Sequence, residues 1–211
     1  DRARSRIGFG LAQQRFPGFE PPQREADEDE QQQLAHRSAS LLNFAELARS
    51  SGIAQTTLKR YFTLLETLFL IHRLPAWERN PAKRLVKAPK VFLPDSGLLA
   101  HLTGHTADTL ATAPGLPGAL VETFVCGELL KHLAFSARGL SLWHYRTQTG
   151  IEVDFLLEDR HGKLTGIEVK AAATVDGKDF KGLRHLQETE AECFQRGIVL
   201  YTGRECVAFG A

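Results

Sequence analysis

Methionine is absent from the sequence, and cysteine occurs only three times in 211 residues. Cys126, Cys193 and Cys206 are scattered and form no CxxC pair. This spacing argues against a disulfide scaffold and a zinc site, and it is typical of reduced thiols in a cytoplasmic protein. Because the chain starts at Asp1 and has no Met, we expect a fragment of a longer product; a degraded gene fragment is one interpretation.

Long apolar runs are also missing. No stretch of about 18 apolar residues occurs, so a transmembrane helix is not expected, and the first residues show no secretory signal pattern. The phosphate-binding pattern GxxxxGK(S/T) does not occur either. We therefore expect no membrane partner and no ATP site of that type in this chain.

Charge is balanced overall but not along the chain. The 26 Lys and Arg residues against 25 Asp and Glu residues give a net charge of +1. Six acids lie between Glu20 and Glu30, whereas the stretch from Arg79 to Lys90 holds five basic residues and no acid. A local basic patch of this kind binds nucleic acid even in a neutral protein, and the alternative is a solvated hairpin.

Composition changes divide the chain into three zones. Residues 1–33 combine scattered Gly, Pro, Arg and Gln with the acidic run, and we expect a disordered or remnant tail. Residues 34–110 and 111–211 have helical and strand periodicity. We expect two folded domains in these two ranges.

The range 34–110 has the pattern of a winged helix-turn-helix. Asn43 with Glu46 is a capping pair for a first helix, and Ser50-Ser-Gly-Ile forms the turn. A second helix is expected from Gln55 to Leu70, with one apolar face of Leu58, Phe62, Leu65 and Phe69. Wing strands are expected at Leu70–Trp77 and Lys90–Leu93, with a basic tip between them.

Two groups of side chains in this range are candidates for binding DNA. The polar face of the second helix would reach the major groove or its phosphates, and the wing tip would contact the backbone. The candidate residues are Gln55, Thr56, Lys59, Arg60, Lys83, Arg84 and Lys87. The alternative is that this domain packs on another domain or on a second copy of the chain.

The range 111–211 predicts an α/β sandwich around a central mixed sheet. Apolar spacing predicts helices over 116–133 and 178–190 and strands over 141–146, 151–157, 164–171 and 197–202. The class of the whole chain is therefore α/β (α+β).

Acidic side chains lie on two of these strands. In the first, Glu152 and Asp154 alternate with Ile151, Val153 and Phe155, and in the second, Glu168 and Lys170 share one face. The short polar connection 159–163 predicts a hairpin, which brings Asp154, Glu168 and Lys170 together. Two carboxylates and an ammonium are what a divalent metal ion and a reacting phosphodiester need; the alternative is an exposed cross-strand salt bridge.

This D…ExK spacing, preceded by Glu122 on a helix, resembles the PD-(D/E)XK nuclease superfamily, with Val153 where the motif usually has Pro. A more extensive similarity, from about Leu41 to Lys170, is to the C-terminal region of prokaryotic AAA-type ATPases named domain of unknown function 4143. It rests on the segments LNFAELARSSGIAQTTLKRYFTLLE, RNPAKRLVKAPKVFLPDSGLLAHL, GALVETFVCGELL, GIEVDFLL and GIEVKA. The resemblance implies an ATPase module upstream, as a partner in the full-length relative.

The resemblance also implies a site. Asp154 and Glu168, with the carbonyl of Val169 and with Glu122 completing the shell, would hold Mg²⁺, for which Mn²⁺ can substitute. Lys170 would position the attacking water, and Glu152, Arg146 and His144 are auxiliary candidates.

Two functions follow from these patterns. The first is a DNA-binding, metal-dependent endodeoxyribonuclease, for which a homodimer would supply the two sites that a resolvase needs. The second is a non-catalytic DNA-binding, regulatory or protein-interaction module coupled to the ATPase.

Overall fold

The computed structural model describes residues 35, 37–84, 87–206 and 208. The expected tail 1–33 lies outside these residues. Within the described ranges, no helix combines the length and the hydropathy that a bilayer crossing requires.

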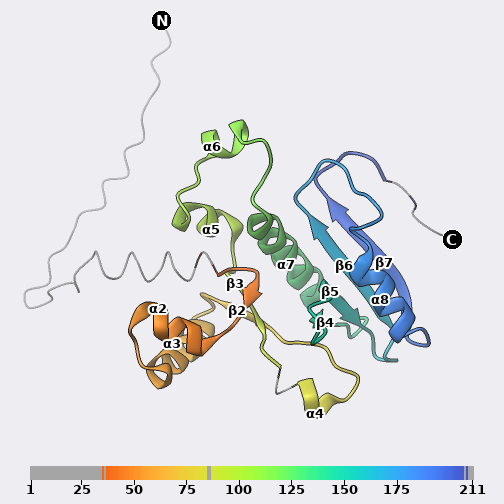
Figure 1. Cartoon of the computed structure of the whole chain (residues 1–211), viewed down its shortest axis with the longest axis horizontal. Helices are drawn as coiled ribbons and strands as arrows, with labels where there is room; N and C mark the ends of the chain where they lie inside the picture. The colour runs from red at the N-terminus through yellow and green to blue at the C-terminus, as the bar shows by residue number, and fades with distance from the viewer. Residues whose placement is uncertain (1–34, 36, 85–86, 207, 209–211) are drawn as a thin grey trace, which may run out of the picture.

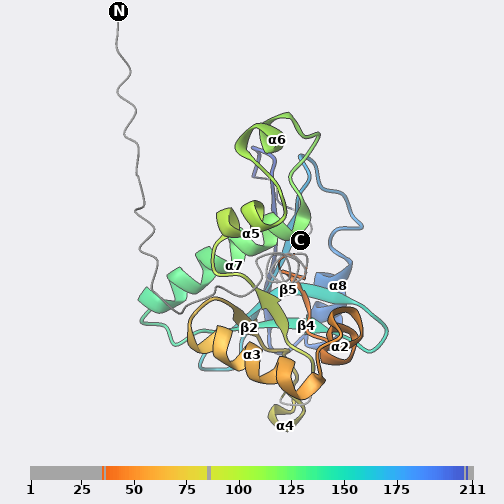
Figure 2. The ribbon, with the colours of Figure 1, turned by 90° about the vertical axis from the view of Figure 1, so that its left-hand side faces the viewer.

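The first half of the described chain contains a small antiparallel sheet and a pair of helices (Figure 1). The elements are β1 (Ser40–Leu41), α2 (Phe44–Ser51), α3 (Gln55–Thr67), β2 (His72–Leu74), α4 (Pro81–Arg84) and β3 (Lys90–Phe92). The strand order is β1-β3-β2, so the last strand lies between the first two. Helices α2 and α3 connect β1 to β2 and lie at the opposite end of the molecule from β7 (Figure 1); this pair of helices faces the viewer in Figure 2.

The start of α2 confirms Asn43 as the cap, whereas the side chain of Glu46, its predicted capping partner, pairs with Arg37. The Asn43 side chain accepts hydrogen bonds from the backbone N–H groups of Ala45 and Glu46, and Gly52 ends the helix in the left-handed conformation at φ 70°. These contacts satisfy helix-end groups that would otherwise lack partners.

The end of α3 differs from the prediction. Leu58 and Phe62 are buried and Leu65 packs on the same cluster, but Phe69 is 84% exposed. The helix ends at Thr67, and Phe69 takes a left-handed φ of 58°, which turns it away from the apolar face. The expectation that Phe69 continues this face is wrong, because the i, i+4 and i+7 spacing aligns side chains only while the backbone is helical, and Phe69 lies beyond the end of α3.

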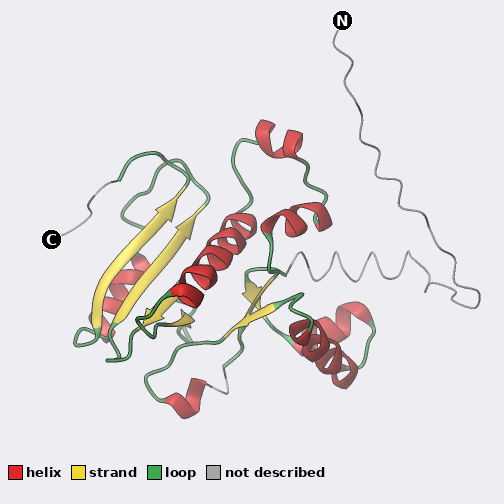
Figure 3. Ribbon diagram, turned by 180° about the vertical axis from the view of Figure 1, so that it is seen from behind, coloured by secondary structure: helices red, strands yellow, loops and turns green. Residues whose placement is uncertain are grey.

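The second half contains a long helix and a four-stranded sheet (Figure 3). The elements are α5 (Ser96–Leu102), α6 (Ala107–Thr112), α7 (Gly118–Phe135), β4 (Ser141–Arg146), β5 (Glu152–Glu158), β6 (Leu164–Lys170), α8 (Lys181–Thr189) and β7 (Phe194–Tyr201). In the order β4-β5-β6-β7 the first two pairings are antiparallel and β6 with β7 is parallel. This confirms the predicted mixed sheet and a mixed α/β class.

Helices α7 and α8 cover different faces of this sheet. Phe155, Ile167 and Val169 share a core with residues of α7, whereas Val153, Leu156 and Leu164 share another with residues of α8. Val153 and Phe155 therefore face opposite sides, and the predicted strict alternation along this strand is wrong there. The register between β4 and β5 shifts between Trp143 and Tyr145, so a β-bulge resets the alternation next to Asp154.

The two halves share one of these cores. Leu74 of β2 and Phe92 of β3 are buried in the same cluster as Cys126 of α7 and Phe155 of β5. The ring centroids of Phe92 and Phe155 lie 5.7 Å apart. The small sheet therefore packs directly against α7 and the four-stranded sheet.

Candidate acidic site

Lys90 lies at the centre of the acidic side chains. It is the first residue of β3 and is only 4% exposed. Its Nζ donates to Asp154 Oδ1 at 2.9 Å and to Glu122 Oε2 at 3.3 Å. One ammonium from the first half of the chain therefore contacts two carboxylates from the second half.

Asp154 is placed by the irregularity in β5. The ladder between β5 and β6 ends at the pair Phe155–Ile167. Beyond it, the backbone N–H of Val169 donates to Asp154 Oδ2 at 3.0 Å. The Asp154 carboxylate thus replaces the backbone carbonyl that would accept this hydrogen bond in a continuing β5–β6 ladder. Its other oxygen, Oδ1, is thereby directed toward Lys90.

Glu168 and Lys170 form the outer part of the cluster. Lys170 Nζ donates to Glu168 Oε1 at 2.9 Å, and the side chains are 31% and 13% exposed for Lys170 and Glu168. Glu168 Oε2 is buried without a hydrogen-bond partner. Such an orphaned acceptor is costly, so Glu168 has an unmet demand for a proton or a cation.

The ionisation of these groups reflects their crowding. Burial, and then the charge of Asp154, raises the pKa of Glu122 to about 7, and the same two causes raise the pKa of Glu168 to about 7. Burial alone would lower the pKa of Lys90, but Asp154 and Glu122 outweigh it and the pKa is raised. Lys90 therefore stays charged, while the two glutamates are poised near neutrality.

Three auxiliary candidates lie around this centre. Arg146 donates to Glu152, and burial followed by the charge of Lys90 lowers the pKa of His144 to about 4. His144 Nε2 lies 3.1 Å from the carbonyl of Ala88, while its Nδ1 is buried without a partner. A neutral imidazole that donates from Nε2 fits both observations.

The arrangement of carboxylates does not offer a ready metal site. Lys90 Nζ occupies the position between Glu122 and Asp154 that a shared cation would take. Across the residues that the structure describes, no group of three or more His, Cys, Asp and Glu side chains is arranged to hold a metal ion. Both oxygens of Asp154 are already engaged, Oδ1 by Lys90 and Oδ2 by the Val169 N–H, so the side chains as placed do not fit a Mg²⁺ ion held by Asp154, Glu168 and Glu122.

The candidate DNA-binding residues of α3 are placed together. Gln55, Thr56, Lys59 and Arg60 all lie in its first half and are all exposed. The Nζ of Lys59 lies 5.9 Å from the ring centroid of Phe44, which keeps the ammonium close to α2.

The candidates between β2 and β3 divide into two kinds. Lys83 is exposed on α4. Arg84 instead makes two hydrogen bonds of 2.9 Å to Glu158 and lies 4.6 Å from the ring centroid of Trp143. Lys87 donates to the carbonyl of Arg146 at 2.9 Å. Arg84 and Lys87 therefore attach this loop to the four-stranded sheet.

Sequence reasoning did not identify Lys90 as part of the acidic site. Its spacing assigned it to a basic wing, and nothing local relates residue 90 to residues 122 and 154. The one available signal was that a lysine opens the otherwise apolar strand segment Lys90-Val-Phe-Leu. A charged residue in such a segment is buried only with a partner.

Comparison with known families confirms part of the resemblance. Residues 117–211 match the family model described as Domain of unknown function (DUF4143). Residues 28–109 match a second model, described as Domain of unknown function (DUF8612). The C-terminal region, which holds all the carboxylates of the site, is therefore similar to the DUF4143 family.

Two mycobacterial proteins are similar to the chain. An uncharacterized protein of Mycobacterium bovis and one of Mycobacterium tuberculosis are each 38% identical to it over 143 residues. The alignment covers 67% of this chain but only 31% of each relative. No solved structure is significantly similar to the chain.

Proposed function

We propose that this chain is a DNA-binding module in which a winged helix-turn-helix is fused to a PD-(D/E)XK-like domain that does not cleave DNA. The observation that carries the proposal is the exposed first half of α3, where Gln55, Thr56, Lys59 and Arg60 lie side by side. Amide, hydroxyl and cationic side chains at the start of a helix are suited to base edges and phosphates.

The topology around α3 supports this proposal. Strand order β1-β3-β2, with α2 and α3 inserted between β1 and β2, is the arrangement expected of a winged helix. The exposed Lys83 on α4 lies in the connection between β2 and β3, where a wing tip would contact the phosphate backbone.

The acidic centre supports the non-cleaving form. Lys90 already supplies a positive charge to Asp154 and Glu122. It belongs to β3, the strand of the first half that packs against the second half. In this proposal the centre holds the DNA-binding half in a fixed position on the DUF4143-type half. In a longer relative, the resemblance implies that the module would connect DNA to an AAA-type ATPase.

The test is binding of a fluorescent 20-base-pair duplex by the wild type and by Lys59→Ala/Arg60→Ala, measured by anisotropy at several salt concentrations. We expect the variant to bind at least about tenfold more weakly, with the salt slope reduced by about 2, because each lost cation releases one counterion fewer. Lys131→Ala/Arg138→Ala, which removes the same charge from exposed residues of the other half, should bind as the wild type does. Absence of wild-type binding would reject the proposal.

A second candidate function is metal-dependent cleavage of DNA. The buried, unpartnered Oε2 of Glu168 beside Lys170 favours it. Cleavage would require a metal ion to displace Lys90 from Asp154. We therefore expect no cleavage of duplex, branched or single-stranded DNA with Mg²⁺ or Mn²⁺; cleavage by the wild type that Asp154→Asn abolishes without unfolding would establish the nuclease instead.

A further inference from the structure

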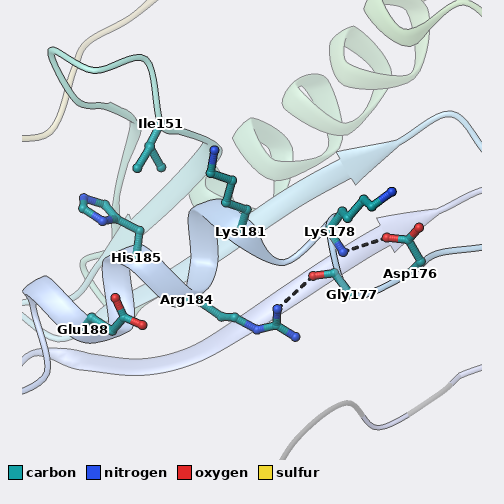
Figure 4. Close-up of a pocket in the computed structure, with 8 residues that line it drawn as sticks. All are labelled: Ile151, Asp176, Gly177, Lys178, Lys181, Arg184, His185 and Glu188. Atoms are coloured by element: carbon teal, nitrogen blue, oxygen red, sulfur yellow. Dashed lines mark hydrogen bonds between the residues drawn. The ribbon is translucent and has the colours of Figure 1, made fainter.

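A shallow hollow of about 770 Å³ lies along α8, between this helix, Ile151 and the loop that holds Asp176, Gly177 and Lys178 (Figure 4). Lys181 and His185 of α8 lie on the side of Ile151, and Lys178 and Arg184 lie nearer to Gly177. Most of this lining was outside the sequence-based candidates, which placed nucleic-acid contacts only on α3 and the wing.

The cations of this hollow are available to a ligand. Over the described residues, the amino groups of Lys178 and Lys181 form no hydrogen bond or ion pair. Arg184 donates from Nη1 to the carbonyl of Gly177 at 2.9 Å, which orients its guanidinium and leaves its other N–H groups unused. An oriented guanidinium beside two free ammonium groups is suited to phosphate oxygens.

Two acids also line the hollow, but one of them is already engaged. Asp176 accepts a hydrogen bond of 2.6 Å from the backbone N–H of Lys178, so it shapes the loop before α8. Glu188 lies one turn beyond Arg184, at the far end of the hollow (Figure 4). The hollow therefore presents the three basic side chains of Lys178, Lys181 and Arg184 against the single carboxylate of Glu188, since Asp176 is held by the loop.

The start of α8 adds to the positive potential. Helix α8 begins at Lys181, so Lys178 and Lys181 lie at the N-terminal end of this helix. The partial positive charge of a helix N-terminus favours an anion there.

The hollow is rigidly placed relative to the acidic site. Gly182 of α8 packs so closely on Glu152 that an added methyl group would collide with the carbonyl oxygen of Glu152. Glu152 is two residues from Asp154, and the loop that leads to α8 begins after Lys170. A ligand in the hollow would therefore lie beside the end of the sheet that carries Glu168 and Lys170.

We propose that this hollow binds phosphodiester groups of a polynucleotide, with Lys178, Lys181 and Arg184 contacting the phosphates and Ile151 with the His185 ring contacting the sugars. The inference rests on the DNA-binding function proposed above and adds a second contact surface to it. Duplex bound by both surfaces would neutralise more phosphates than α3 and α4 contact by themselves.

The experiment compares four proteins on the same labelled 20-base-pair duplex: wild type, Lys178→Ala/Lys181→Ala, Lys59→Ala/Arg60→Ala and the control Lys131→Ala/Arg138→Ala. We expect Lys178→Ala/Lys181→Ala to bind about tenfold more weakly, with a salt slope reduced by about 2. Both lysines are exposed, so thermal unfolding of the variant should match the wild type. Calorimetric titration with inorganic phosphate is the second arm, and we expect no heat from it.

The outcomes separate the two proposals. Weaker binding by both the α8 and the α3 variants supports the second surface. Weaker binding by the α3 variant alone overturns this inference and leaves the DNA-binding function intact. No binding by any protein overturns both, and phosphate heat that disappears in Lys178→Ala/Lys181→Ala, with unchanged DNA binding, assigns the hollow to free phosphate.

Discussion

Among single residues, Lys90 has the largest influence on the chemistry of the acidic site. Its ammonium contacts Glu122 and Asp154 and is almost fully buried. Buried charges persist only where partners compensate the loss of water, and removing one partner leaves the other charges uncompensated. The residue therefore matters more to the fold than a surface lysine.

Lys90→Met should lower the free energy of unfolding by about 3–5 kcal/mol at neutral pH, because Asp154 and Glu122 would lose their shared cation. The deficit should shrink in acid, where protonation of Glu122, whose pKa is raised to about 7, removes one of the negative charges around residue 90. Urea denaturation at pH 5 and pH 8 measures both effects. Lys131→Met, at an exposed lysine paired only with Glu128, is the matched control and should have little effect.

The raised pKa values of Glu122 and Glu168 predict how stability depends on pH. Both pKa values are about 7 in the folded protein against an ordinary value of 4.5. Between these values the folded state binds more protons than the unfolded state, so this contribution is full below about pH 4.5. It is lost as the pH rises through 7.

The expected result is a free energy of unfolding that falls between pH 5 and pH 8. Glu122→Gln and Glu168→Gln should each flatten that fall, because an amide does not titrate. Denaturation curves at half-unit pH intervals provide the measurement. A wild-type stability that rises over this range would contradict the prediction.

Among the contacts between helices and strands, the one between α8 and β5 is too close to admit a side chain at residue 182. Gly182 lets the first turn of α8 rest directly on the backbone of Glu152, and Leu183 and Leu186 then fill the core beneath. A side chain at residue 182 would push the helix off the sheet.

Gly182→Ala should destabilise the protein by about 1–3 kcal/mol, the usual cost of forcing extra volume into a packed contact. Gly118→Ala at the start of α7 is the opposite case, because no atom lies within 4 Å of the added methyl group. Higher helix propensity should make that variant slightly more stable. Thermal unfolding of the two variants should shift in opposite directions.

For the chain as a unit, the two halves are joined by a shared core and by ion pairs. The ring of Phe92 packs on that of Phe155. Salt bridges join Lys90 to Asp154 and Arg84 to Glu158. These contacts are buried or partly buried, so separating the halves would expose apolar surface and charges together. The described chain should unfold in one step.

We expect the unfolding curves from Trp fluorescence and from far-ultraviolet circular dichroism to coincide. Trp77 and Trp143 both lie against Arg84, so fluorescence reports the junction, while dichroism reports the helices. Arg84→Ala should cost about 1.5–3 kcal/mol, the usual value for hydrogen bonds to a charged group. Arg79→Ala breaks another pair between the halves, but Arg79 is 61% exposed and the loss should be small.

Local patterns predicted most of the secondary structure. Period-two and period-3.6 spacing placed α7, β4, β5, β6 and α8 within a few residues, and the Asn43 cap placed the start of α2. These features depend on neighbours in sequence, which a pattern can show. Phe69 and the bulge at Asp154 were missed because a helix end and a strand irregularity interrupt the period on which the pattern depends.

The grouping of Asp154, Glu168 and Lys170 across a hairpin was predictable, since turn length and strand period set it, whereas Glu122 of α7 was added by the family resemblance. That Lys90 joins the group was decided only when β3 packed beside α7 and β5. Burial and Coulomb energy depend on three-dimensional distance, and residues 90, 122 and 154 become neighbours only in the packed protein. Sequence therefore supplied the acids of the site, and tertiary packing supplied the cation that pairs with two of them, Glu122 and Asp154.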